Sequence, residues 1–506
     1  MRFVTTAADD SRRFWVLFLA AAAIKVLIAA ALPLTGDEAY FALYARNPDW
    51  GGFYDHPPMV GWMLWLMGHA GSHEAILRLP AVALGLLLPL ALYWCLRDVD
   101  ERKARLVALL LLLTPIYLVG VLITTDTGLI LFGFLSVVAL YRAEAGGRRS
   151  AYALAGLLLG LAIYSKYFAL LLAFSYVVYF LLRARHRWPG FLLLFAVAGV
   201  FVGLNLLWNY LNCWNHIMFN VVNRHPGNGS LDLRNLVVYV LMLGYLFALP
   251  AWFLLRDRDR VVGAVRSTPW LVFVIAGAVP LGVFLLLSPL RSIGLHWVLL
   301  FVPLLYVLYV FLPRRSLERS LAFMTVFAGL HLAVIASVLM YPPHWLEERD
   351  IHRDAVFYGD PRNVAQALEP FEADHYAIGS YARAGVLSHY TDEYWSVFGT
   401  GSQYAREDDR ITDWTARDGD SVLVFGKRYP IRPEDVEPYF ERVEYTELEV
   451  GGVPFQIALG RGFRYQVYHE EVLQDVRKLY YRIPEWLPVG GCRFLARYFG
   501  DMPENR

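Results

Sequence analysis

The sequence predicts a polytopic α-helical membrane protein with a C-terminal α/β domain outside the membrane. Hydrophobic residues make up 57% of the 506 residues and charged residues only 18%, whereas soluble domains carry about 25% charged residues. Long apolar runs recur throughout residues 1–341. From residue 342 onward charged residues become frequent, and no run is long enough to cross a bilayer. We therefore expect a membrane domain at residues 1–341 and a soluble domain at residues 342–506.

Eleven apolar runs each predict one membrane-spanning helix. The first run is too long for the core of a signal peptide, so we expect an uncleaved anchor. Lys25 lies in the middle of this run, where we favour snorkelling of its amine over a partner inside the bundle. The runs are Phe14–Leu34, Ala75–Leu96, Ala104–Ile123, Thr127–Tyr141, Ala151–Tyr164, Tyr167–Leu182, Phe191–Trp208, Leu233–Leu255, Trp270–Ser288, Leu295–Leu312 and Leu317–Tyr341.

Basic residues collect in alternate loops between these runs. Arg12 and Arg13 precede the first run, and Arg142, Arg148 and Arg149 follow the fourth. The opposite set of loops contains few basic residues: Arg46, Lys166, Arg224 and Arg291. Because Lys and Arg mark the cytoplasmic side, we expect a cytoplasmic N-terminus. An odd number of spans then puts residues 342–506 outside the cell membrane.

Short segments outside the spans have secondary structure of their own. In the first outer loop, PPMVGWMLWLMGHAG is short, apolar and aromatic, so we expect helices that lie in the membrane interface. Trp62 and Trp65 suit that depth. In the C-terminal domain SVLVFGKRY and VPFQIALG predict strands, whereas PRNVAQALEPF and HEEVLQDVRKLYYRI predict helices.

Two aspartates lie where outer loops meet the predicted spans. Asp37 follows Gly36 after the first run, and Asp126 ends the third run in ITTDTGLI. Acidic groups held at a membrane boundary indicate function. Both also have structural alternatives, because Asp126 suits an N-cap and Asp37-Glu38 suits a first helical turn. We expect the two aspartates, which come from different loops, to face one cavity.

The segment around the outer loop Asn209–Asp232 is rich in Asn and Trp. Tryptophan rings stack on the apolar faces of sugars, and amides pair with sugar hydroxyls. Asn209, together with Trp208, therefore predicts a sugar contact. An interfacial aromatic belt would explain the Trp residues but not the Asn residues.

Several cationic or titratable side chains on the outer side predict contacts with an anionic headgroup. Each also has an alternative as an ordinary surface residue, and Lys166, between two apolar runs, could simply snorkel. The side chains are His56, Lys166, Arg224, Arg291 and His296.

Composition and spacing argue against several classes of function. The net charge is +1, so there is no basic field to recruit nucleic acid. Cys95, Cys213 and Cys492 are far apart and form no CxxC or zinc-ligand spacing, so we expect unpaired thiols rather than a disulfide framework. No P-loop or GxGxxG motif lies at a strand–helix junction, which fits an enzyme without a nucleotide site.

The motifs GDEAYF, DHPP, ITTDTGLILF, SKYFALLL and LLWNYLNCWNHIMF together resemble the GT-C glycosyltransferases, which use polyprenyl-phosphate sugars. The most similar subgroup is the bacterial one related to protein O-mannosyltransferases and to the aminoarabinose transferase that acts on lipid A. The resemblance covers the chain as far as the tenth run. It implies a bacterial inner membrane, a polyprenyl-phosphate-linked sugar donor, and an envelope glycolipid, glycan or protein as acceptor.

The resemblance also implies roles for individual residues. The essential carboxylate of the family falls on Asp37, the second acid on Asp126, and the lysine that contacts the lipid phosphate on Lys166. The aminoarabinose transferases carry an acidic residue and a lysine before Pro-Pro, where this chain has Asp55 and His56. Phosphate binding by His56 and a divalent metal at Asp55 therefore stay open. The other expected substrate contacts are Glu38, Asn209, Arg224, Arg291 and His296.

The chemistry of a lipid-phosphate donor fits this set of residues. A polyprenyl phosphate is a good leaving group that needs cationic stabilisation, and the acceptor hydroxyl needs a base. We expect Asp37 to be the base, with Lys166 and either Arg224 or His56 on the phosphate, and inversion at the anomeric carbon. The alternative is a lipid or sugar transporter or flippase, which should have paired halves and ionisable groups near the bilayer midplane.

Overall fold

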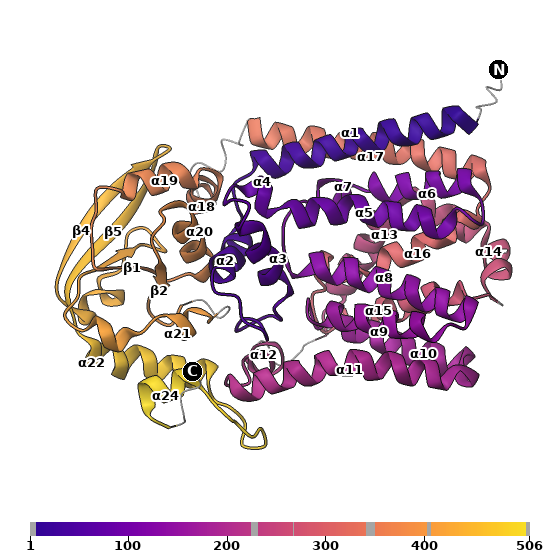
Figure 1. Ribbon diagram of the computed structural model, residues 1–506. Helices are drawn as coiled ribbons and strands as arrows, with labels where there is room; N and C mark the ends of the chain where they lie inside the picture. Colours follow the sequence, from indigo (N-terminus) through magenta and orange to yellow (C-terminus); the bar gives the residue numbers. More distant parts are fainter. Residues whose placement is uncertain (1–6, 224–230, 267, 341–349, 402–405, 502–506) are drawn as a thin grey trace. The chain divides into compact units, whose positions relative to one another are not determined.

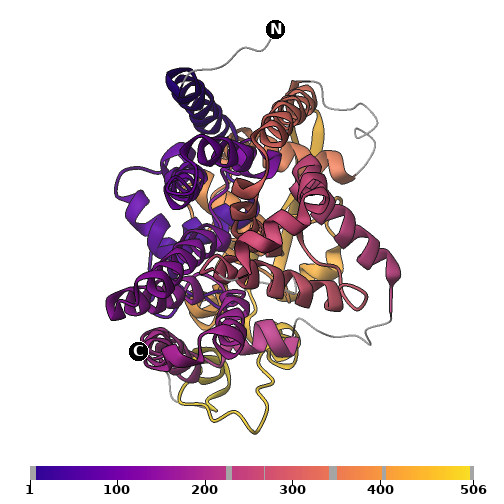
Figure 2. The same ribbon diagram turned by 90° about the vertical axis from the view of Figure 1, so that its right-hand side faces the viewer.

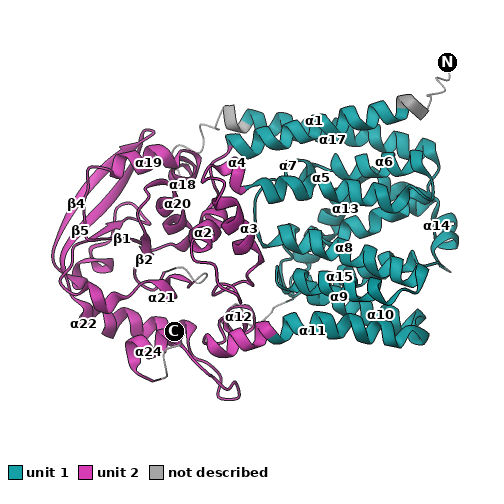
Figure 3. Ribbon diagram, viewed as in Figure 1, with its two compact units in different colours: residues 1–31, 78–203, 227–341 teal, residues 32–77, 204–226, 342–506 magenta. Residues whose placement is uncertain are grey.

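The computed structural model describes residues 7–223, 231–266, 268–340, 350–401 and 406–501. The chain forms two compact units (Figure 3). Unit 1 contains residues 1–31, 78–203 and 227–341, and unit 2 contains residues 32–77, 204–226 and 342–506. Unit 2 therefore combines the C-terminal segment with two segments that the sequence analysis placed in outer loops.

Unit 1 is a helical bundle whose long helices run roughly parallel (Figures 1 and 2). Among the described residues, six helices are long and apolar enough to cross a membrane, which confirms the membrane-protein character. The total of eleven spans stays a prediction. The six are α1 (Ala7–Ala31), α5 (Leu79–Leu96), α8 (Thr125–Gly146), α11 (Trp188–Leu211, its last turns in unit 2), α13 (Leu233–Arg256) and α17 (Arg314–Met340). Shorter helices are α6 (Glu101–Leu112), α7 (Pro115–Val119), α9 (Arg149–Ile163), α10 (Ala169–Arg183), α14 (Arg258–Val265), α15 (Leu271–Leu287) and α16 (Phe301–Tyr306), with 3₁₀ segments η1 (Arg185–Arg187), η3 (Leu295–Val298) and η4 (Val307–Phe311).

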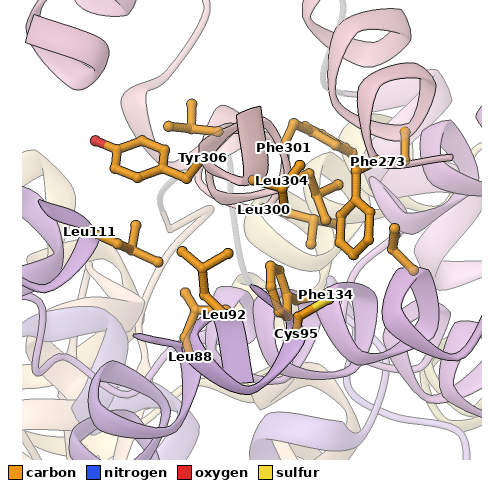
Figure 4. Close-up of a cluster of buried hydrophobic side chains, with 14 of the residues drawn as sticks. Leu88, Leu92, Cys95, Leu111, Phe134, Phe273, Leu300, Phe301, Leu304 and Tyr306 are labelled. Atoms are coloured by element: carbon orange, nitrogen blue, oxygen red, sulfur yellow. The ribbon is translucent and has the colours of Figure 1, made fainter. Parts of the chain in front are cut away.

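The core of unit 1 lies between α5, α6, α8, α15 and α16 (Figure 4). Leu92, Leu111, Phe134 and Phe273 are fully buried there. The outward faces of the same bundle stay apolar, and Leu286 is 78% exposed. An apolar residue tolerated at that exposure fits a helix that faces lipid rather than water.

The predicted run Ala104–Ile123 is not one continuous helix. Pro115 has no backbone N–H to continue α6, and it starts the short helix α7. The carbonyls of Tyr117 and Gly120 accept hydrogen bonds from Nζ of Lys25 at 2.5 and 3.0 Å. A broken helix in a membrane needs such partners for its freed backbone groups. Lys25 is fully buried, so the predicted snorkelling is wrong and its amine pairs inside the bundle.

A five-stranded mixed sheet forms the centre of the C-terminal segment, in the order β2-β1-β3-β5-β4. β1 pairs in parallel with β2 and β3, and β5 pairs antiparallel with β3 and β4. Gly451 and Gly452 close the β4–β5 hairpin with φ values of 57° and 72°, which glycine adopts without steric strain. The predicted strands are confirmed as β3 and β5. The strands are β1 (His375–Ile378), β2 (Trp395–Val397), β3 (Val422–Phe425), β4 (Phe440–Val450) and β5 (Val453–Phe463).

Helix α2 (Gly36–Ala45) packs closely against α20 (Tyr381–Tyr390), which connects β1 to β2. The contact needs a glycine, because a Cβ atom at Gly385 would lie 2.6 Å from the backbone nitrogen of Tyr40. The predicted helices of the C-terminal segment are confirmed as α19 and α23; the first loop contains the helix α3, whose place in the membrane interface stays a prediction. The other helices of unit 2 are α3 (Met59–Gly68), α4 (Glu74–Leu77), α12 (Asn215–Ile217), α18 (Asp350–Gly359), α19 (Pro361–Leu368), α21 (Asp408–Ile411), α22 (Tyr465–Tyr468), α23 (Gln474–Tyr480) and α24 (Arg493–Phe499).

Cys213 and Cys492 form a disulfide within unit 2, across 279 residues of sequence. The prediction of unpaired thiols is therefore wrong for these two residues, although Cys95 is free and buried. Sequence spacing could not reveal this pair, because only the fold brings the two segments together. The bond connects the segment after α11 to the residue that precedes α24.

Candidate active site

Asp126 and Lys166 form an ion pair within unit 1. Nζ of Lys166 lies 2.9 Å from Oδ1 and 2.8 Å from Oδ2 of Asp126. The Lys166 and Asp126 side chains are 11% and 12% exposed. Thr124 is the N-cap of α8 and forms a capping box with Thr127. The alternative prediction that Asp126 is itself the cap is therefore wrong, and its carboxylate is left to hold Lys166.

Aromatic rings connect this ion pair to the segment that carries His296. Nζ of Lys166 lies 5.5 Å from the ring centroid of Phe168, and that ring lies 4.9 Å from the ring of Trp297. The rings of Trp297 and His296 are 6.2 Å apart. His296 and Arg291 are exposed. The structure thus places the predicted Lys166 and His296 segments side by side in unit 1.

Asp37 is the second residue of α2 in unit 2, just as Asp126 is the second residue of α8 in unit 1. Thr35 is the N-cap, and the carboxylate of Glu38 accepts a hydrogen bond from the Thr35 nitrogen at 3.0 Å. Asp37 is exposed, and its Oδ1 accepts a hydrogen bond from the hydroxyl of Tyr381 at 3.2 Å. Glu38 is fully buried in the capping box. Its carboxylate thus serves the helix terminus, and a contact between Glu38 and substrate stays a prediction.

Two tyrosines link Asp37 to a second carboxylate, Asp55. The ring of Tyr381 lies 5.1 Å from the ring of Tyr40, whose hydroxyl donates to Oδ1 of Asp55 at 2.8 Å. Asp55 is buried, and its Oδ2 lies 3.8 Å from Nε2 of His56. Burial and nearby carboxylates raise the pKa of both tyrosines, so their hydroxyls stay protonated donors at neutral pH.

Neither of these tyrosines was predicted from the sequence. Tyr40 could have been found, because it lies three positions after Asp37 on the same helix and residues at that spacing share a face. Tyr381 lies 344 positions after Asp37, and no local pattern marks it.

The Asn- and Trp-rich segment is part of the folded interior of unit 2. Trp208 is fully buried and stacks on His216 at 4.6 Å. The side-chain amide nitrogen of Asn209 lies 3.1 Å from Nδ1 of His216. The Asn209 amide oxygen accepts a hydrogen bond from the backbone nitrogen of His216 at 3.0 Å. Burial lowers the pKa of His216 to about 3, so the ring is neutral and Nε2 donates to the Phe53 carbonyl at 2.6 Å. Asn209 is fully buried, and its contact with a sugar stays a prediction.

Asn220, in the same Asn- and Trp-rich segment, contacts Asp55. The amide of Asn220 donates to the backbone oxygen of Asp55 at 3.2 Å. The predicted Arg224 lies outside the described residues.

A buried acidic cluster anchors the backbone next to Asp55. Glu407 accepts a hydrogen bond from the Tyr54 nitrogen at 2.6 Å and another from Arg410 at 2.8 Å. Burial outweighs the attraction of Arg410 and raises the pKa of Glu407 to about 7. Burial likewise raises the pKa of the neighbouring Asp408 to about 6. This cluster was not predicted from the sequence.

Two protein groups lie at the position of the predicted metal: the carboxylate of Asp55 and the imidazole of His56. Across the described part of the chain, no three His, Cys, Asp or Glu side chains are placed to hold a metal ion. Hard cations such as Mg²⁺ bind to one or two carboxylates together with water and substrate phosphate. A divalent metal at Asp55 therefore stays a prediction.

The predicted site residues thus fall into two groups, one in each unit. Asp126, Lys166 and His296 belong to unit 1, whereas Asp37, Asp55 and His56 belong to unit 2. The meeting of Asp37 and Asp126 at one cavity stays a prediction.

Comparisons with known proteins agree with the resemblance carried by the motifs. Residues 55–208 match the family described as dolichyl-phosphate-mannose-protein mannosyltransferase. Two crystal structures of ArnT from Cupriavidus metallidurans, one in the apo state and one bound to undecaprenyl phosphate, match the fold with a TM-score of 0.63 and 16% identity. Each match covers 88% of this chain and 98% of that chain. No curated protein sequence matches significantly. The chain therefore has the fold of ArnT, and its resemblance to the GT-C glycosyltransferases is confirmed.

Proposed function

We propose that this protein is a glycosyltransferase that moves a sugar from a polyprenyl phosphate to an acceptor in the bacterial envelope. The observation that carries the proposal is the Asp126–Lys166 ion pair, a cation fixed at the end of an apolar helix in a chain with the fold of ArnT. The ArnT structure bound to undecaprenyl phosphate supports a lipid phosphate as the donor carrier. The acceptor is a glycolipid such as lipid A, a glycan or a protein.

In this proposal Lys166 stabilises the phosphate that leaves. Negative charge grows on the phosphate as the anomeric bond breaks, and a fixed ammonium group lowers the energy of that charge. Asp126 holds Lys166 in position through both carboxylate oxygens. His56, Arg224, Arg291 and His296 are further candidates for contacts with the donor phosphate or sugar.

Asp37 acts as the general base. Its carboxylate is exposed, and the Tyr381 hydroxyl orients it. It accepts the proton of the acceptor hydroxyl while the hydroxyl oxygen attacks the anomeric carbon. Direct displacement inverts the anomeric configuration, and it needs no second carboxylate at the scissile bond, unlike glycoside hydrolysis.

We place the reaction at the outer face of the inner membrane, with eleven spans, a cytoplasmic N-terminus and residues 342–506 in the periplasm. The alternation of basic loops supports this orientation. The Cys213–Cys492 disulfide in unit 2 also supports it, because disulfides persist in the oxidising periplasm and are rare in the cytoplasm.

The test compares envelopes by mass spectrometry. A deletion strain should lack one sugar increment on lipid A or on an envelope glycan, and the wild-type gene should restore it. Asp37→Asn should lower transfer by about 10²–10⁴-fold, the usual contribution of a general base. Glu393→Gln, at an exposed acid of the same unit, is the matched control and should restore the increment.

Full restoration by Asp37→Asn, with normal membrane insertion, would remove the enzyme assignment as proposed. Lipid translocation by the purified protein in liposomes without an acceptor would favour the transporter or flippase instead.

A further inference from the structure

A cavity of about 240 Å³ lies in unit 1, and its lining includes no residue of the proposed active site. It opens where the C-terminal end of α8 meets the end of α10, the turn η1 and the start of α15. The part of its lining that bears on binding consists of Glu144, Tyr179, Arg183, His186, Arg187 and Arg266. Three guanidinium groups and one imidazole thus surround a single carboxylate.

The one carboxylate is already engaged by tyrosines. Glu144 accepts hydrogen bonds from the hydroxyls of Tyr152 and Tyr179, one to each oxygen. Arg183 donates to the backbone oxygen of Arg266 at 2.6 Å, which fixes the Arg183 side chain beside the backbone of Arg266. Three guanidinium groups against one carboxylate leave the lining of the cavity with a net positive charge.

Arg187 provides the second, independent observation. Within the described residues, its Nε is buried and has no hydrogen-bond partner. A buried donor without an acceptor is costly, and native proteins rarely leave one in that state. Arg187 also lines the cavity, where a guanidinium group can donate paired hydrogen bonds to phosphate oxygens.

The cavity lies at the membrane end opposite to the Asp126–Lys166 pair. Asp126 is in the first turn of α8 and Glu144 is in its last turn, 18 positions later. At 1.5 Å per residue this is about 27 Å, close to the thickness of the hydrocarbon core. α14, at the right-hand end of the bundle in Figure 1, marks this end. Trp188, which directly follows η1, is 59% exposed, as expected for an aromatic ring at the membrane–water interface.

We propose that this cavity binds the phosphate of an anionic phospholipid headgroup, at the membrane face opposite to the catalytic ion pair. Basic pockets between membrane helices on the cytoplasmic side are suited to such headgroups. The volume is smaller than the roughly 300–1,000 Å³ of pockets for drug-sized ligands, and it suits a phosphate with a small headgroup rather than a nucleotide. The bound phosphate bridges the ends of α10 and α14 through Arg183, Arg187 and Arg266.

Lipid binding to the full-length protein in detergent tests the proposal. Native mass spectrometry measures the dissociation constants of dioleoylphosphatidylglycerol and dioleoylphosphatidylcholine. The wild type should bind the anionic lipid at least about tenfold more tightly, and Arg187→Gln should remove that preference. Arg185→Gln is the matched control, because Arg185 is in the same turn, is exposed, and does not line the cavity. It should bind as the wild type does.

Equal affinity of wild type and Arg187→Gln for the anionic lipid would overturn the proposal, as would equal binding of the two lipids by the wild type. If Arg187→Gln unfolds, Arg266→Gln at the exposed rim provides the same test. Inorganic phosphate distinguishes the source of the anion. Retention of the lipid in millimolar phosphate supports the headgroup, and its complete displacement assigns the cavity to free phosphate and rejects the lipid.

Discussion

Lys166 donates hydrogen bonds to both carboxylate oxygens of Asp126, at 2.9 and 2.8 Å, across 40 residues of sequence. The pair is nearly buried at the N-terminal end of α8. A cation held by two oxygens is fixed in position, which favours the binding of a phosphate at that point.

Lys166→Gln should destabilise the protein by about 3 kcal/mol, because it leaves the Asp126 carboxylate buried without its cation. Asp126→Asn combined with Lys166→Gln should recover most of this loss, since neither charge then remains. In both variants the rate of sugar transfer should be about 100-fold lower than in the wild type, because the phosphate has lost its cation. Thermal unfolding in detergent and transfer assays would separate the two effects. Equal stability of the single and double variants would contradict this account of the pair.

Tyr381→Phe should lower kcat for sugar transfer about fivefold with little change in KM. The substitution removes the hydroxyl that orients Asp37, and one hydrogen bond of about 1 kcal/mol corresponds to roughly that factor. Tyr429→Phe is the matched control, because Tyr429 also donates to a carboxylate, Glu447 at 2.8 Å, on the exposed surface of the same unit. A similar loss in both variants would show that Tyr381 has no specific role in orienting the base.

Local patterns predicted most of the secondary structure. Apolar runs gave the long helices, and a short apolar segment bounded by a glycine and charged residues gave the strand Val422–Phe425. Asp126 and Lys166 were predicted because both stand at the ends of apolar runs, where a charge is expensive without a partner. These features depend on neighbours within one helix or strand, so a single sequence contains them.

Contacts between distant segments could not be predicted in the same way. Asp37 meets Tyr381 only because α2 packs on α20, and the packing depends on Gly385. Asn209 has the residue type of a sugar ligand, yet burial beside His216 uses its amide within the fold. A residue type indicates which interactions a side chain can make, and only the fold decides which partner it finds.

Loss of the disulfide should destabilise unit 2 by about 2–5 kcal/mol, the range measured for native disulfides. Cys213→Ser, Cys492→Ser and the double variant should therefore unfold at the same lower temperature. Thiol labelling of the unfolded, unreduced wild type should modify one cysteine, Cys95. Cys95→Ser is the control, and its unfolding temperature should still fall on addition of reductant. Labelling of three cysteines before reduction would show that the bond is absent.

Glu407 should make unit 2 less stable as the pH rises. Its pKa is about 7 in the folded protein and 4.5 in its ordinary state, because burial disfavours the charged form. Between these values Glu407 holds a proton in the native state that the unfolded chain releases. The contribution of protonated Glu407 to the free energy of unfolding is therefore full below pH 4.5 and is lost as the pH rises through 7. A shift of this size corresponds to about 3 kcal/mol. Unfolding temperatures at pH 5, 6, 7 and 8 should decline in the wild type and in Glu393→Gln, and should decline less in Glu407→Gln, where Asp408 still titrates in the same direction. An identical slope in all three proteins would contradict the assignment to Glu407.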